Sequence, residues 1–196
     1  MWNYKTPGIP DDFFERTEKV PITKEEVRVI QLSKARLNPG YVVYDIGCGS
    51  GSISIEASIQ VENSGKIFAI DYDPIAVELT KKNINKFGIT NISVIHGNAK
   101  EKINNLEQAD VIFIGGTGGD TSEIINLCQS KLKIGGRIVV ATILIETLFA
   151  VLKIFEQLQF DSVDITQVTI SKSRKTTKGS MMISRNPVTI ISATKL

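Results

Sequence analysis

A glycine-rich turn constrains the fold of this chain more than any other feature. Residues 45–51 read Asp-Ile-Gly-Cys-Gly-Ser-Gly, with the apolar run 41–44 before them and the helix-like segment 52–57 after them. The apolar run predicts a buried strand. The glycines let the backbone turn sharply with positive φ and let a ligand lie against it. A strand, a tight glycine turn and a helix form the first unit of a nucleotide-binding α/β domain.

The spacing of these glycines separates the turn from two common phosphate-binding loops. The third glycine comes one residue too early for the dinucleotide fingerprint, and no Lys followed by Ser or Thr is present as in a P-loop. An acidic residue before G-x-G-x-G instead resembles motif I of class I S-adenosylmethionine (SAM) methyltransferases, whose loop holds the amino-acid part and ribose of SAM. The alternative is a purely structural turn. The candidate cofactor-binding residues here are Gly47, Cys48, Gly49, Ser50 and Gly51.

Length and composition predict a single domain spanning residues 1–196, with 42% of residues hydrophobic and 22% charged. No apolar run reaches the roughly 18–20 residues that span a bilayer, and the N-terminus lacks a signal-peptide layout, so we expect no membrane partner. Two cysteines are too few for a disulfide framework or a four-ligand zinc site, so we expect no metal and a cytoplasmic location. A net charge of +2 gives no global reason to expect nucleic acid.

Strand-like and helix-like segments alternate along the chain. The predicted strands are 41–44, 66–71, 92–95, 110–114 and 137–140, and the predicted helices are 52–61, 74–87, 122–132 and about 145–157. This alternation predicts a mostly parallel sheet with helices on both faces. Segments 163–171 and 188–193 are also β-like and predict a terminal antiparallel hairpin. The predicted fold is therefore α/β, a Rossmann-like class I SAM methyltransferase fold with a mostly parallel seven-stranded sheet and a C-terminal antiparallel hairpin.

The first 38 residues are expected to form a segment and a helix that cover SAM and substrate. Thr23 precedes Lys24-Glu25-Glu26 and is predicted to cap this helix, because acidic residues are favoured in a first turn.

Polar residues at the ends of the second and third strands are candidate ligands for an adenosyl group. Asp71 follows the glycine loop by about twenty residues, where a carboxylate accepts hydrogen bonds from both ribose hydroxyls. Asp73 directly precedes Pro74 and is the better helix cap, which leaves Asp71 for the ligand; the alternative is an exposed turn acid. The residues expected near the adenine are Tyr72, Asn98 and Ala99.

A glycine tract follows the fourth strand, where the methyl group of SAM meets its acceptor in this fold. Its residues are Gly115, Gly116, Thr117, Gly118 and Gly119. Four glycines remove side-chain bulk, so a large flat substrate can approach; the alternative is a flexible connection. The [DN]-P-P-[YFW] motif of amino-directed methyltransferases and the Pro-Cys of RNA cytosine-C5 enzymes are both absent.

Basic residues near both ends of the chain are candidate partners for a polyanion, either RNA phosphates or a substrate with many carboxylates. The alternative is a solvated loop. The only histidine, His96, ends a strand and is expected to have a surface or packing role. The C-terminal basic residues are Lys172, Arg174, Lys175 and Lys178, and the N-terminal ones are Arg16, Lys19, Lys24 and Arg28.

Several segments together resemble one family, the decarboxylating C15-methyltransferases of cobalt-precorrin in anaerobic cobalamin biosynthesis. The aerobic precorrin-6Y methyltransferase carries a similar C-terminal domain. The departures from the family pattern are mild: Ile22 stands where methionine is usual, and Ser50 and Thr117 stand where Thr and Ser are common. The segments that carry the resemblance are 8–14, 22–28, 32–37, 45–51, 115–119 and 184–188.

The resemblance implies methyl transfer from SAM to the C15 meso carbon of a corrinoid, with loss of carbon dioxide from the ring C acetate. It also implies a homotetramer, and it places Thr23 against SAM. The flat substrate would lie on residues 115–119, and its carboxylates would reach Arg174, Lys175 and Lys178. No catalytic acid or base is identified, because the electron-rich macrocycle supplies the nucleophile.

Two other functions stay open at this point. The basic C-terminal run favours an RNA methyltransferase, although an RNA-recognition extension and the nitrogen-directed motif are both lacking. A catalytically silent SAM- or nucleotide-binding subunit is the third possibility, and the intact glycine loop, Asp71 and the glycine tract argue against it.

Overall fold

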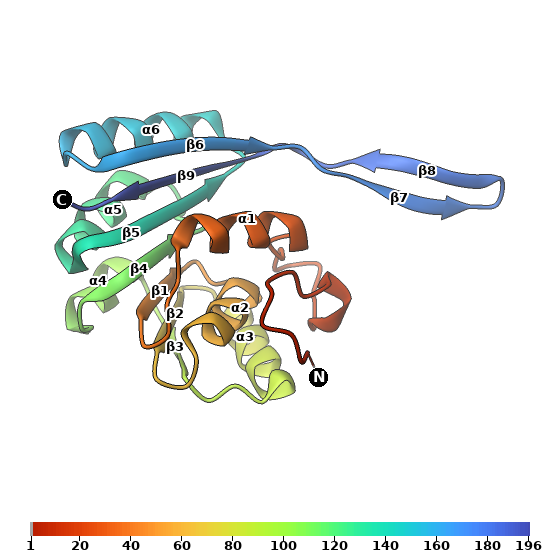
Figure 1. The fold of residues 1–196 in the computed structure, drawn as a ribbon, viewed down its shortest axis with the longest axis horizontal. Helices are drawn as coiled ribbons and strands as arrows, with labels where there is room; N and C mark the ends of the chain where they lie inside the picture. Colours follow the sequence, from red (N-terminus) through yellow and green to blue (C-terminus); the bar gives the residue numbers. More distant parts are fainter. Residues whose placement is uncertain (1) are drawn as a thin grey trace.

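The computed structural model describes residues 2–196, in which helices cover both faces of a seven-stranded sheet (Figure 1). The strands are β1 (Val42–Ile46), β2 (Lys66–Asp71), β3 (Ile92–His96), β4 (Ala109–Ile114), β5 (Leu132–Thr142), β6 (Asp161–Val168), β7 (Ser171–Thr176), β8 (Gly179–Ser184) and β9 (Val188–Thr194). The helices are α1 (Glu25–Ala35), α2 (Ser52–Val61), α3 (Pro74–Phe87), α4 (Ala99–Lys102), α5 (Thr121–Lys131) and α6 (Ile145–Gln157), with 3-10 turns η1 (Asp11–Phe13) and η2 (Ile103–Asn105).

The strand order of the main sheet is β3-β2-β1-β4-β5-β9-β6. Strands β1 to β5 pair in parallel, whereas β9 runs antiparallel to both of its neighbours, β5 and β6. The predicted mostly parallel seven-stranded sheet with a C-terminal antiparallel pair is therefore confirmed. Because the parallel strands all end at one edge, the loops that follow them gather there.

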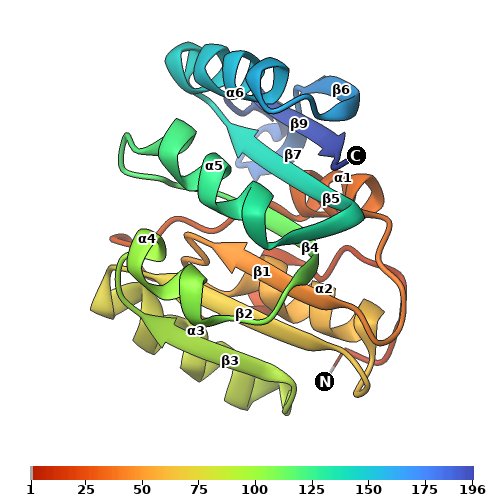
Figure 2. The same cartoon turned by 90° about the vertical axis from the view of Figure 1, so that its left-hand side faces the viewer.

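Helices divide between the two faces of the sheet, as Figure 2 shows with α4 and α5 in front of it and α2 and α3 behind. One apolar core joins the sheet to α5 and α6, and a second joins it to α1 and α2. Strands buried on both faces need continuous apolar runs, which explains why β1 and β4 are almost entirely buried. Within residues 2–196 no helix is long and apolar enough to span a membrane.

Local sequence signals predict both ends of α3. The carboxylate of Asp73 accepts a hydrogen bond from the Ile75 amide at 2.8 Å, and Pro74 takes the first helical position. The helix stops at Gly88, which has a φ of +68°. The predicted cap at Asp73 is thus confirmed, and it leaves the side chain of Asp71 outside the helix.

The predicted cap of the first helix was wrong. Lys24, not Thr23, occupies the cap position of α1, and it makes no side-chain capping bond. The first free amide of the helix, that of Glu25, donates instead to Asp11 Oδ1 at 3.0 Å. The carboxylate of Asp11, fourteen residues upstream, therefore accepts the capping hydrogen bond that local pattern rules assign to the hydroxyl of Thr23.

Strand β5 is longer than the predicted 137–140, since it begins at Leu132, includes Gly135 and Gly136, and runs to Thr142. The Gly135 amide donates to the Lys195 carbonyl at 2.8 Å, and the Lys195 amide donates to Gly136 at 3.0 Å. These two bonds to the residue after β9 hold both glycines in the strand, although Gly135 itself has a φ of +75°. The short elements α4 and η2 after β3 were not predicted.

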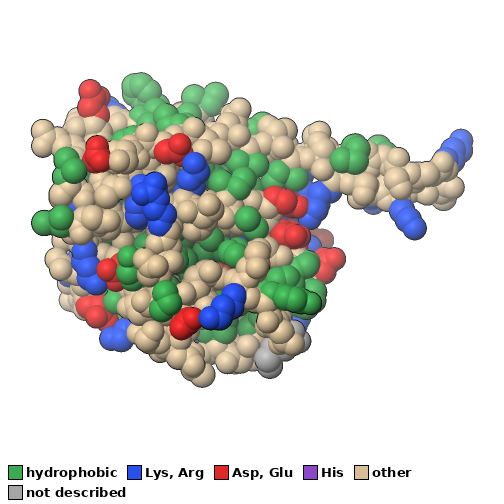
Figure 3. All heavy atoms as spheres, in the orientation of Figure 1, with side chains coloured by type: hydrophobic (Ala, Val, Ile, Leu, Met, Phe, Trp, Pro, Cys, Tyr) green, Lys and Arg blue, Asp and Glu red, His purple; other side chains and the backbone are tan. Residues whose placement is uncertain are grey.

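A second hairpin occupies the polar stretch between β6 and β9, where only a connection was expected. Strands β7 and β8 pair with each other and with no strand of the main sheet. The hairpin stands away from the body of the molecule (Figure 1), with basic atoms near its tip and hydrophobic atoms along it (Figure 3). Most of the basic run therefore lies in a strand, and only Lys178 lies in the turn that joins β7 to β8.

The segment before α1 packs over α2 and α3, where Ile9 and Phe14 are buried in an apolar cluster. Arg28 lies beneath it with no exposed surface. Its guanidinium donates to Glu56 Oε1 and to Asp11 Oδ1, each at 2.8 Å. Arg28 is thus an internal anchor of the N-terminal segment, and its predicted role as a substrate-facing cation was wrong.

Candidate functional site

A cavity of about 330 Å³ opens where the parallel strands end. Residues from the ends of β1, β2, β3 and β4 line it, so four separate stretches of sequence meet at one place. Among the residues predicted for the site, those that line the cavity are Gly47, Asp71, Tyr72, Asn98, Ala99, Gly116, Thr117 and Gly118.

The glycine loop after β1 adopts backbone conformations that favour glycine, with φ of +72° at Gly47, +55° at Gly49 and +74° at Gly51. A Cβ on Gly47 would lie 2.6 Å from the carbonyl oxygen of Gly116. The loops after β1 and β4 therefore touch backbone to backbone, and a side chain at Gly47 would push them apart.

The other loop residues lie beneath the cavity wall and not on it. Cys48 and Ser50 are buried, and burial raises the pKa of the Cys48 thiol. The Cys48 sulfur sits 3.5 Å from the hydroxyl oxygen of Thr80. Cys48 is therefore packed as a neutral thiol, which does not suit a nucleophile.

Two polar side chains of α3 hold the glycine loop from behind. Thr80 donates to the Gly49 carbonyl at 2.9 Å, and the Asn83 amide donates to the Ser50 carbonyl at 2.9 Å. Asn83 also accepts from the Glu15 amide at 2.7 Å, so it ties the N-terminal segment to the loop. Sequence reasoning missed both residues; the available signal was two polar residues three apart on the buried face of an amphipathic helix.

Asp71 is the carboxylate at the cavity. Its Oδ2 accepts from the Gly49 amide at 2.9 Å and its Oδ1 accepts from the Asp73 amide at 3.0 Å. Each oxygen has a second lone pair that can accept from a ligand. These backbone contacts fix the orientation of the carboxylate before any ligand binds.

The acid of motif I, Asp45, is more deeply placed than Asp71. It is buried in β1 and accepts a hydrogen bond from the Ser54 hydroxyl. Burial raises the pKa of Asp45 to about 6, partly opposed by that hydrogen bond and assisted by the nearby charge of Asp71. Asp45 does not line the cavity, so its position is that of a support beneath the loop.

The predicted adenine side of the site is formed by the turns after β2 and β3. Tyr72 is exposed over 68% of its surface and lines the cavity mouth. His96 Nε2 lies 3.1 Å from the Tyr72 carbonyl oxygen, which joins the two turns. Asn98 accepts from the Lys100 amide at 3.0 Å and caps α4, and Ala99 is buried beneath it.

The glycine tract after β4 has one crowded end and one open end. A Cβ on Gly115 would lie 3.1 Å from the Gly47 carbonyl oxygen, whereas Cβ atoms on Gly116, Gly118 or Gly119 would meet nothing within 4 Å. The Thr117 hydroxyl pairs with that of Thr121 at 2.6 Å, which ties the tract to the first turn of α5. The tract therefore presents bare backbone to open space beside the cavity.

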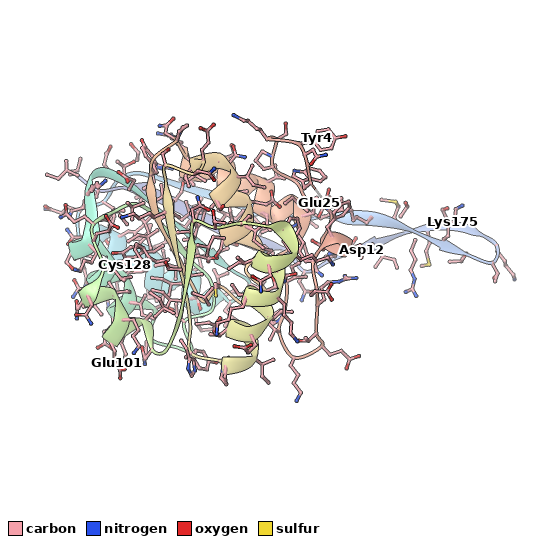
Figure 4. The ribbon with its side chains drawn as sticks, turned by 90° about the horizontal axis from the view of Figure 1, so that it is seen from below. Tyr4, Asp12, Glu25, Glu101, Cys128 and Lys175 are labelled. Atoms are coloured by element: carbon pink, nitrogen blue, oxygen red, sulfur yellow. The ribbon has the colours of Figure 1, made fainter. Side chains whose placement is uncertain are left out.

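The remaining predicted site residues are not brought to the cavity in this chain. Thr23 is absent from its lining, and its carbonyl accepts from Arg28. Arg174, Lys175 and Lys178 are exposed on the hairpin. Figure 4 places Lys175 far out on the hairpin, at the opposite end of the molecule from Glu101 of α4, the helix that starts at the cavity.

Strand order, glycine turn and cavity together define the class I methyltransferase fold. A SAM-dependent O-methyltransferase from Thermotoga maritima shares it, with a TM-score of 0.78 at 21% identity over 92% of this chain and 68% of that chain. The chain belongs to the precorrin methyltransferase family, because the family model described as "Precorrin methyltransferase domain" matches residues 12–195. The family resemblance predicted from the sequence is thus confirmed.

Two relatives illustrate the similarity. A Saccharolobus solfataricus protein named "Probable cobalt-precorrin-6B C(15)-methyltransferase (decarboxylating)" is 46% identical over 99% of this chain and 98% of its own length. A solved structure titled precorrin-6y C5,15-methyltransferase from Geobacter metallireducens is 38% identical, with a TM-score of 0.91 over 99% of this chain and 100% of that chain.

Proposed function

We propose that the protein transfers the methyl group of SAM to the C15 meso carbon of a cobalt-precorrin and releases carbon dioxide from the ring C acetate. The observation that carries the proposal is the cavity, where a fixed carboxylate and an open glycine tract lie side by side. The names of the relatives supply the substrate class. An electron-rich macrocycle is itself the nucleophile, so the site needs to orient the two reactants and not to activate a side chain.

The residues of the cavity fit SAM. Asp71 keeps acceptor capacity for the two ribose hydroxyls while two backbone amides hold it in place. The turn at Gly47 leaves room for the amino-acid part, and Tyr72, Asn98 and Ala99 surround the place of the adenine. SAM supplies an electrophilic methyl group, and the open glycine tract is where an acceptor can approach it.

We attribute catalysis in this site to the alignment of SAM with the acceptor carbon. Fixing two reactants at attack distance contributes up to about 7–11 kcal/mol in favourable cases. The contact between the loops at Gly47 and Gly116 sets the separation between the cofactor side and the acceptor side of the site. Loss of carbon dioxide returns the electron pair of the broken bond to the macrocycle, where it neutralises the positive charge left by methyl transfer. The remaining CH2 gains a proton as C15 loses one, so this step too needs no side chain as a nucleophile.

Asp71→Ala is expected to weaken SAM binding by about 1–3 kcal/mol, because hydrogen bonds to a charged acceptor are lost. Isothermal calorimetry with SAM measures this. Asp73→Ala is the matched control, since it removes a neighbouring carboxylate that caps α3 and should leave SAM affinity nearly unchanged. Equal SAM affinity in folded Asp71→Ala and in the original protein would remove Asp71 from the site.

The acceptor is tested by transfer from labelled SAM. We expect cobalt-precorrin to gain one methyl group and lose one carbon dioxide by mass analysis, and bulk tRNA and rRNA to stay unlabelled. The exposed cations of the hairpin are the one feature that favours RNA as a second candidate. Label on RNA and none on the corrinoid would establish that candidate instead. NAD binding in place of SAM would contradict both.

We further propose that the protein is a homotetramer assembled through the β7–β8 hairpin. A lone two-stranded hairpin is marginally stable in water, yet this one exposes Met181, Met182 and Ile183 along β8. In an assembly Arg174, Lys175 and Lys178 would reach substrate carboxylates at the site of another copy. Light scattering at micromolar concentration should report four copies, and Met181→Ser with Met182→Ser should lower that number; a monomer in the original protein would overturn this proposal.

The two cysteines are free and buried, which suits the reducing cytoplasm that we propose as its compartment.

A further inference from the structure

An exposed apolar patch lies where β5 passes into α6. Ile143, Leu144, Ile145 and Phe149 expose 62%, 56%, 79% and 70% of their surfaces. Ile145 and Phe149 are four residues apart in α6 and therefore share one face of the helix. Only Val151 and Phe155, further along α6, are buried in the core. The first turn of the helix also carries the exposed, charged Glu146, and its Leu148 packs against the core, so the exposed apolar surface of α6 is confined to the side of Ile145 and Phe149.

The backbone places this patch next to the glycine tract. Strands β4 and β5 are parallel neighbours with Ile114 opposite Val140. The tract starts directly after Ile114, and Ile143 follows Val140 by three residues, so both segments leave the same edge of the sheet from adjacent strands. The Leu144 amide donates to the Thr142 hydroxyl at 3.0 Å, which fixes the turn between strand and helix.

The cavity and the patch lie on opposite sides of the tract in the strand order. The cavity draws on the ends of β1, β2, β3 and β4, and the patch follows β5, on the other side of β4. Between them the glycines present no side chains, and Cβ atoms at three of them would meet nothing within 4 Å. An acceptor that reaches the cavity across the tract would have its far side over the patch.

We propose that the patch formed by Ile143, Leu144, Ile145 and Phe149 is a platform for the apolar face of the substrate macrocycle, and that it sets the distance between the meso carbon and the methyl group. This inference rests on the proposed function. The conjugated ring of a cobalt-precorrin has a broad apolar surface around its central cobalt and carries its carboxylates at the rim. Burying that face on aliphatic and aromatic side chains is favourable in proportion to the area removed from water, while the rim carboxylates stay free for cations.

The experiment uses the full-length protein with SAM bound and cobalt-precorrin as the probe. Ile145→Ser and Phe149→Ser, singly and together, change exposed side chains, so folding should be preserved. We expect the dissociation constant for the corrinoid, followed by its visible absorption, to rise at least about tenfold in the double variant. The affinity for SAM and the oligomeric state should not change.

Ile134→Ser is the matched control. Ile134 is 83% exposed on the same strand, β5, but near its other end, away from the cavity. It should bind the corrinoid as the original protein does. An equal loss of affinity in Ile134→Ser and in the double variant would show a general effect of surface hydrophobicity and overturn the platform.

The outcomes separate the platform from the proposed function. Normal corrinoid affinity in an active double variant overturns the platform and leaves the function intact. Corrinoid binding that depends on the patch, in a protein that transfers no methyl group to the corrinoid, overturns the function and supports the platform. Normal corrinoid affinity with a changed oligomeric state assigns the patch to an interface between copies.

Discussion

Gly47→Ala is expected to abolish measurable SAM binding while the protein still folds. Gly47 has a φ of +72°, and an added Cβ would lie 2.6 Å from the oxygen and 3.0 Å from the nitrogen of Gly116. The left-handed conformation alone costs about 1–2 kcal/mol for a non-glycine residue. The contact with Gly116 is the larger effect, because a backbone atom cannot move aside as a flexible side chain does. Relief of the clash would separate the β1 and β4 loops, which are two of the four segments that line the cavity.

The variant Gly135→Ala is the control that introduces backbone strain without a steric clash. Gly135 has a φ of +75°, and a Cβ there would meet nothing within 4 Å. Gly47→Ala should lose more stability than Gly135→Ala on urea unfolding, because it adds the clash to the strain, and only Gly47→Ala should lose SAM binding by calorimetry. Two variants with equal SAM affinity would show that the close approach of Gly47 to Gly116 is not required for the cofactor.

Features of the fold that depend on neighbours in sequence were predictable. The turn at 45–51, the cap at Asp73 and the stop at Gly88 each follow from the conformational preferences of a few consecutive residues. The buried runs of β1 and β4 were visible for the same reason, because strands covered on both faces need continuous apolar sequence.

Features that depend on distant partners were not predictable. Nothing near Thr23 shows that Asp11 will cap α1, because the two segments meet only after the N-terminal segment folds over α2. No local signal shows that β5 includes Gly135 and Gly136, because the backbone hydrogen bonds that hold them go to Lys195, near the C-terminus. The unbroken run of polar residues in β7 resembles a solvated loop, since that strand has no buried face.

The candidate site likewise contains residues that could be predicted from local sequence and residues that depend on distant partners. Most of its cavity-lining residues follow the ends of strands, where topology alone brings them together, so these could be predicted, whereas Gly97, Asp120 and Ile124 were missed. Thr80 and Asn83 act on loop carbonyls 31 and 33 residues away along the chain, and no local pattern reports such contacts. Arg28 was misjudged because a cation in sequence resembles a surface cation, whereas two carboxylates from other segments surround it in the fold.

Arg28→Met is expected to lower the free energy of unfolding by about 3–5 kcal/mol, the usual loss when one partner of a buried ion pair is removed. Glu56 is only 1% exposed and would lose its cationic partner, which leaves the amides of Gly8 and Ile9 as its remaining partners. The N-terminal segment should loosen as well, because Arg28 also donates to the Ile9 carbonyl. Urea unfolding measures the first effect, and limited proteolysis within residues 8–20 measures the second.

Two further variants decide whether the lost stability comes from an unpaired buried charge. Arg16→Met removes an exposed cation that pairs with Asp12, and surface pairs of this kind contribute about 0–1 kcal/mol. Glu56→Gln placed on top of Arg28→Met keeps an acceptor for the amides but removes the stranded charge, so the double variant should recover part of the stability. No recovery in the double variant would assign the loss to the packing of the Arg28 side chain. A loss below about 1 kcal/mol in Arg28→Met would contradict the anchoring role altogether.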